Sequence, residues 1–197
     1  MSKEKTLCLT SDLVQPQGMT PLALIHRDWA DSVDSGSYMK RQWLSCFYVQ
    51  KMIRDCNPAL PEQVSRHLIS VHEHQKQLLE SFLGKQPDPE EIPPSFYVQR
   101  LDEKLFQGHT PVSVAGSLMS LALMYTRGAL RYVELAKHKW PSPLWATLIG
   151  EAYSNATVCI TALKRMPGID LLSEWAIAVE KETEVMTEIY KHNGLKA

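Results

Sequence analysis

The feature that most constrains the fold of this chain is the placement of its prolines and glycines. Nearly all of the 12 prolines, and most of the 9 glycines, fall in short gaps between segments whose apolar residues recur every three or four positions. This spacing is typical of amphipathic helices joined by loops. Three of the gaps end in a hydroxyl residue followed by proline, which suits the start of a helix: Thr20-Pro21, Thr110-Pro111 and Ser142-Pro143. The pattern predicts an all-α protein.

The same pattern sets the expected organisation. Residues 1–19 lack periodicity and are expected to form a flexible N-terminal arm, whereas 20–197 are expected to form a single helical domain. Inside that domain, residues 84–94 hold four prolines and three acidic residues, which predicts an extended acidic connector. We expect an irregular bundle of about seven helices, over residues 21–34, 38–56, 62–83, 96–107, 111–138, 143–165 and 171–192.

Composition excludes several classes of protein. The 21 basic and 22 acidic residues nearly cancel, so there is no electrostatic ground for expecting nucleic acid as a partner. The uncharged stretch over residues 112–126 is shorter than the roughly 20 residues that a membrane span needs, so membrane insertion is not expected. The first residues are too polar for a secretory signal. Because the four cysteines form no CxxC pair, we expect reduced thiols in a cytoplasmic protein.

Three histidines on the segment 62–83 are the densest group of candidate metal ligands. His67, His72 and His74 include no pair at the i, i+4 spacing that lets two imidazoles on one helix hold one ion. We therefore expect no metal site and no cofactor there, and we expect these histidines to flank an apolar seam. The seam consists of Val64, Leu68, Val71, Leu78 and Phe82.

Arg66 and His72 carry a resemblance to an enzyme family. With five residues between them, they resemble the Arg-x(4–6)-His signature of HEPN-type ribonucleases, which are themselves compact helical domains. The resemblance implies that this pair would be catalytic in RNA cleavage; Arg131 and His138 match the same spacing. Chance matches are expected in a chain of this composition, and an unbroken helix places Arg66 and His72 about 120° apart. We keep the ribonuclease as an alternative hypothesis.

The common catalytic motifs are missing. No Glu-x-x-His pair, GxGxxG, GxxxxGK[ST] or GxSxG occurs, which argues against di-iron, dinucleotide, phosphate-loop and α/β-hydrolase sites. A helical bundle that binds a small apolar ligand between its helices stays open as a second alternative.

The last predicted helix carries the candidate binding residues. Glu180, Glu184 and Glu188 recur every four residues with Glu182 beside them, and like charges at this spacing destabilise a helix slightly. One interpretation is a solvated acidic face; the other is a surface that binds a basic partner.

These observations favour a protein whose role is to bind other proteins. We expect a non-enzymatic adaptor or chaperone-like accessory subunit of a larger assembly, for example of a bacterial secretion machine. Other protein subunits are the expected partners and Glu180, Glu182, Glu184 and Glu188 the expected contact residues. No small-molecule ligand is expected.

Overall fold

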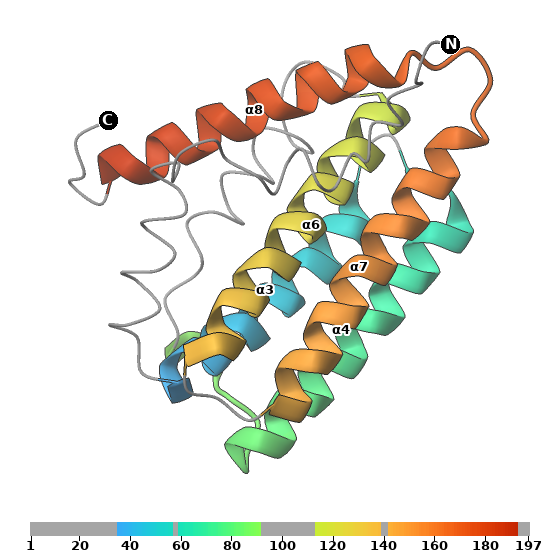
Figure 1. Cartoon of the computed structure of the whole chain (residues 1–197). Helices are drawn as coiled ribbons and strands as arrows, with labels where there is room; N and C mark the ends of the chain where they lie inside the picture. Colours follow the sequence, from blue (N-terminus) through green and yellow to red (C-terminus); the bar gives the residue numbers. More distant parts are fainter. Residues whose placement is uncertain (1–34, 57–58, 92–112, 139–141, 193–197) are drawn as a thin grey trace, which may run out of the picture.

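The structure, a computed structural model, describes residues 35–56, 59–91, 113–138 and 142–192 (Figure 1). Within these residues the chain forms five α-helices, one short 3-10 helix and no strand, which confirms the predicted all-α fold. The elements are α3 (Ser35–Asp55), α4 (Glu62–Leu83), η1 (Pro89–Glu91), α6 (Val114–His138), α7 (Ser142–Lys164) and α8 (Leu171–His192).

Part of the prediction lies outside the described residues. This is the case for the N-terminal arm over 1–19 and for the helices expected over 21–34 and 96–107. The expected count of about seven helices is therefore not confirmed.

Two helices, α4 and α8, have the predicted bounds, and a local signal defines one end of each. α4 stops at Gly84, whose φ of 70° lies in the left-handed region that glycine adopts without strain. α8 starts after Asp170, whose Oδ1 accepts hydrogen bonds from the backbone N–H of Leu172 at 3.1 Å and of Ser173 at 3.4 Å. Hydrogen bonds from Ser173 and Leu172 to the ionised carboxylate lower the pKa of Asp170.

Three boundaries differ from the prediction. Residues 35–37, expected to be a non-helical gap between two helices, form the first turn of α3. Residues 89–91, expected to be extended, form η1, where Asp88 Oδ1 accepts from the N–H of Glu90 at 2.9 Å. α6 begins at Val114, and Ser113 caps it: Ser113 Oγ accepts from the N–H of Gly116 at 2.9 Å.

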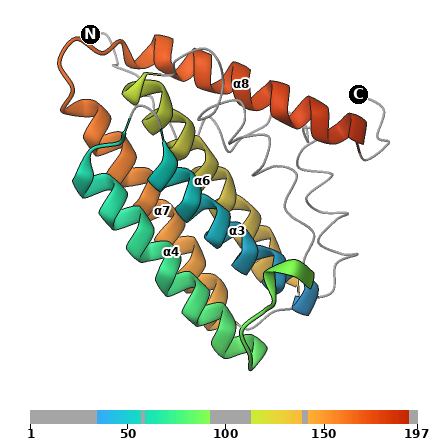
Figure 2. The same cartoon turned by 180° about the vertical axis from the view of Figure 1, so that it is seen from behind.

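α3, α4, α6 and α7 form a four-helix bundle built from two antiparallel hairpins. α3 packs against α4 and α6 packs against α7, and the pairs meet where α4 packs against α7 in the opposite direction (Figures 1 and 2). α8 starts at the end of the bundle where α6 begins, and it packs against α6 (Figure 2). Among the described helices, α6 is the one against which α8 packs closely.

The buried apolar side chains form two clusters, and each cluster takes residues from all four helices of the bundle. The first cluster lies at the α8 end and includes Val49, Met52, Ile53, Val64, Leu68, Leu118, Leu121, Ala122, Ala156, Cys159, Leu163 and Ala178. The second lies at the other end and consists of Tyr38, Trp43, Leu44, Leu79, Ala129, Tyr132, Leu144, Trp145, Leu148 and Ala152.

Candidate functional site

One face of α8 is exposed and combines apolar with acidic side chains. Leu172 is 73% exposed and Ile177 is 49% exposed, whereas Ala178 and Val185 on the opposite side are buried. At 100° per residue, the residues Leu172, Ile177, Glu180, Glu184 and Glu188 fall within one half of the helix circumference. We call these five residues the α8 face.

The glutamates of the α8 face differ in their surroundings. Glu180 is exposed, whereas Glu184 and Glu188 are half-buried. Lys181 Nζ lies 3.8 Å from Glu184 Oε2 and offsets part of the negative charge. The side chain of Glu182, the fourth predicted contact residue, lies outside the described residues.

The two residues of the ribonuclease alternative do not meet within one chain. Arg66 is exposed and forms an ion pair with Glu62 one turn earlier. His72 is only 5% exposed, and its Nε2 lies 2.9 Å from the hydroxyl oxygen of Tyr125 on α6. Arg66 thus lies on the exposed side of α4, and His72 lies on the side that faces the core.

A shallow groove of about 830 Å³ follows the exposed side of α4. Its lining includes Arg54 of α3 with Glu62, Arg66, Glu73 and His74 of α4. His72 is not among the lining residues, so the groove does not unite Arg66 with His72 either.

His74 of α4 faces α7. Its Nδ1 contacts Glu151 Oε1 where the two helices pack together. His67 is half-buried. In the described part of the chain, no three His, Cys, Asp or Glu side chains are placed to hold a metal ion.

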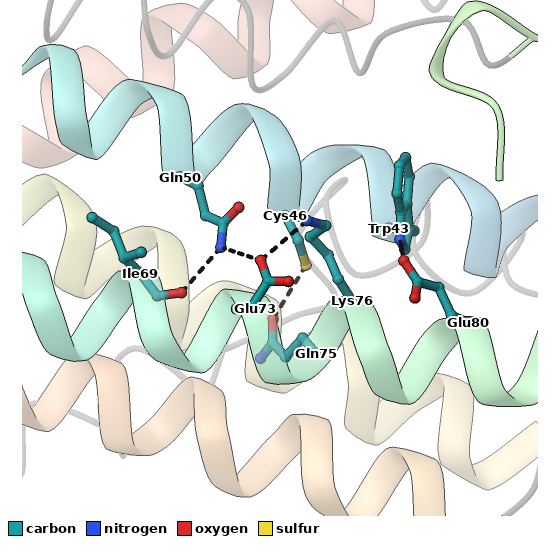
Figure 3. A network of polar contacts seen from close by, with 8 residues as sticks. All are labelled: Trp43, Cys46, Gln50, Ile69, Glu73, Gln75, Lys76 and Glu80. Carbon is teal, nitrogen blue, oxygen red and sulfur yellow. Dashed lines mark hydrogen bonds and ion pairs between the residues drawn. The ribbon is translucent and has the colours of Figure 1, made fainter. Parts of the chain in front are cut away.

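Polar side chains hold α3 and α4 together (Figure 3). Trp43 Nε1 donates to Glu80 Oε1 at 2.7 Å, and Gln50 Nε2 donates to both Glu73 Oε2 and the carbonyl oxygen of Ile69 at 3.1 Å. The bond from Gln50, together with the nearby Lys76 ammonium, lowers the pKa of Glu73. These contacts fix the register between α3 and α4.

A polar layer separates the two apolar clusters. Each helix of the bundle contributes at least one residue to this layer. Along the sequence of the helix, that residue lies where the residues of one cluster end and those of the other begin. Cys46 Sγ donates to Gln75 Oε1 at 3.3 Å, and His72 contacts Tyr125. The polar layer consists of Cys46 on α3, His72 and Gln75 on α4, Tyr125 on α6 and Asn155 on α7, all of them buried.

The groups of the polar layer are uncharged at neutral pH. Burial lowers the pKa of His72 to about 4, an effect that Gln75 opposes only in part. Burial also raises the pKa of Cys46 to about 12 and that of Tyr125 well above 10. The layer therefore offers hydrogen-bonding groups without a net charge.

Sequence reasoning missed the polar layer. His72 was expected to flank the apolar seam of its helix, but the structure places it in the core, where it contacts Tyr125 of α6. Asn155 carried a signal that could have been used: it is a polar residue within the apolar repeat formed by Ala152, Ala156 and Cys159.

Comparison with protein-family models, with curated proteins and with solved structures found no match to this chain. Among the described helices, none is both long enough and apolar enough to cross a membrane.

Proposed function

We propose that this chain is a non-enzymatic protein-interaction subunit of a larger assembly and that α8 is its docking helix. The observation that supports this most directly is the α8 face, where exposed Leu172 and Ile177 stand beside a row of glutamates. An adaptor or chaperone-like accessory role fits such a surface.

The apolar part of the face would supply binding energy. Burying a large aliphatic side chain contributes roughly 1.5–3 kcal/mol, and Leu172 and Ile177 lie less than two helical turns apart. A partner that covers both side chains removes a contiguous apolar area from water.

The acidic part of the face would select the partner. Glu180, Glu184 and Glu188 follow the apolar residues along α8, and their mutual repulsion is relieved when cations approach them. We infer that the partner is a protein surface with apolar side chains next to Lys or Arg. Complementary charge of this kind mainly raises the association rate and the specificity.

The test uses the full-length tagged chain in cells of its natural host. Partners captured by the wild-type chain are identified by mass spectrometry, then purified and titrated against wild type and against two variants, Glu184→Lys/Glu188→Lys and Leu172→Ser/Ile177→Ser. Glu62→Lys, an exposed charge reversal on α4, serves as the matched control. Circular dichroism checks that each variant keeps its helix content.

The expected result is a stoichiometric complex that both α8 variants weaken at least tenfold and that Glu62→Lys leaves unchanged. The charge reversal should also reduce the dependence of affinity on salt. Equal affinity for all four chains would contradict the docking role of α8.

A further inference from the structure

Three polar atoms of the polar layer have no hydrogen-bond partner within the described part of the molecule. They are Nδ1 of His72 and both side-chain atoms of the Asn155 amide, Nδ2 and Oδ1. Asn155 is fully buried and His72 is 5% exposed, so bulk water does not reach these atoms. Buried polar groups in folded proteins almost always have a partner. We therefore expect these three atoms to have a hydrogen-bond partner that is not part of the described protein.

The packing of α6 on α7 shows that Asn155 and His72 have similar positions along the bundle axis. The rings of Tyr132 and Trp145 are in contact across these antiparallel helices, with centroids 5.8 Å apart. Two turns away from that contact, Tyr125 on α6 is level with Ala152 on α7, and Asn155 is about 4.5 Å further along the axis. Because His72 contacts Tyr125, the three side chains lie within about one helical turn.

The packing of α4 on α7 gives the same answer independently. His74 contacts Glu151, and the two helices are antiparallel. Four residues beyond Glu151, Asn155 is level with Ser70, which is two residues, or about 3 Å along the axis, from His72. Two separate contacts thus place Asn155 and His72 at one level, between the two apolar clusters.

The chemistry of the unpaired atoms defines what they can bind. The Asn155 amide offers one acceptor and a pair of donors, and Nδ1 of His72 is a donor or an acceptor according to the tautomer. A ligand that satisfies all three must both donate and accept, and it must be small and neutral because the layer itself is uncharged. Water meets these conditions, since a buried water makes two to four hydrogen bonds.

We propose that the polar layer is an internal hydration site in which water bridges the side-chain amide of Asn155 and Nδ1 of His72. A metal cation does not fit, because in the described part of the chain no three His, Cys, Asp or Glu side chains lie together as metal ligands. An apolar ligand does not fit either, because it would leave all three atoms unpaired.

The test is a measurement of NOE and ROE cross-peaks between water and side-chain protons in the full-length chain labelled with ¹⁵N and ¹³C. We expect long-lived water cross-peaks at the Nδ2 protons of Asn155 and at the ring protons of His72. Native mass spectrometry of the same sample should give the mass of the chain alone. This measurement on the wild-type chain tests the hydration site without the need for a variant.

Asn155→Leu sharpens the test because leucine has a similar size and cannot hydrogen-bond. Water cross-peaks at His72 should disappear in this variant and persist in Ser154→Ala, the matched control at the neighbouring exposed position on α7. Three results would overturn the proposal: wild type without water cross-peaks at Asn155, a direct scalar coupling across an Asn155–His72 hydrogen bond, or a co-purified molecule that adds mass and occupies the site.

Discussion

α4 and α8 are both 22-residue amphipathic helices, yet they occupy opposite situations in the molecule. α4 has α3 on one side and α7 on another, and Val64, Leu68 and Leu79 on its core face are buried. Among the described helices, α8 makes extensive contacts with α6 alone, and its Leu172 is exposed. The number of neighbours, rather than the apolar pattern, decides whether a helix serves the core or presents a surface.

The largest difference should appear when leucine is replaced by alanine on each helix. Leu68→Ala on α4 removes a fully buried side chain and should lower the free energy of unfolding by about 2–5 kcal/mol. Leu172→Ala on α8 should change it by no more than about 0.5 kcal/mol. Urea denaturation followed by circular dichroism measures both. Similar losses for the two variants would show that α8 is covered as completely as α4.

A second test concerns acid, which should act on the bundle through His72. The unfolded chain binds a proton at this residue near its ordinary pKa of 6.5, while burial lowers the pKa in the folded chain to about 4. Between these values the unfolded state binds more protons, so stability falls as the pH is lowered from 6.5 to 4, by about 3 kcal/mol in total from this residue.

Denaturation midpoints from pH 7 to pH 4 test this prediction. His72→Gln should lose this part of the pH dependence, because glutamine does not titrate. His74→Gln, a change on the exposed side of the same helix, should keep it. The readout is the difference between wild type and variant, because carboxylates contribute equally to both. Parallel curves for wild type and His72→Gln would contradict the prediction.

A smaller effect should be confined to α8. Asp170→Ala removes the side chain that caps this helix and should cost about 1 kcal/mol. Because α8 packs closely against α6 alone among the described helices, its amide protons should exchange faster while those of α4 keep their protection. Hydrogen exchange measured by NMR separates the two helices, with Ser154→Ala as the control. Uniformly faster exchange would mean that α8 unfolds together with the bundle.

The smallest effect is expected on the exposed side of α4. Arg66→Ala breaks the exposed ion pair with Glu62 and should change stability by no more than about 0.5 kcal/mol. The same variant tests the ribonuclease alternative, because we expect wild type and variant to be equally inactive in an RNA-cleavage assay. Cleavage by wild type that Arg66→Ala abolishes would restore that alternative.

The sequence predicted helices well where local signals define them. α4 and α8 have the expected bounds because Gly84 and Asp170 act through their own backbone and side-chain geometry. Local rules failed for η1, where a proline at the first position of a short helix is tolerated as readily as in an extended segment.

The candidate sites were harder to predict because they depend on neighbours. Leu172 is a large apolar residue of an amphipathic helix but is 73% exposed, since no described helix packs over it. His72 was placed beside the core and lies inside it, since α6 supplies Tyr125 above it. Periodicity identifies the faces of a helix; it does not say how many of them another helix will cover.

The division of the core into two clusters has a consequence for synthesis of the chain. The split runs across the hairpins rather than between them, so α3 and α4 together hold only a part of each cluster. The α3–α4 hairpin leaves the ribosome before α6 and α7 exist, and during that interval its half of both clusters lacks the α6 and α7 side chains against which it packs. Completion of the fold must wait for the second hairpin, and until then the nascent chain presents an apolar surface to which chaperones can bind.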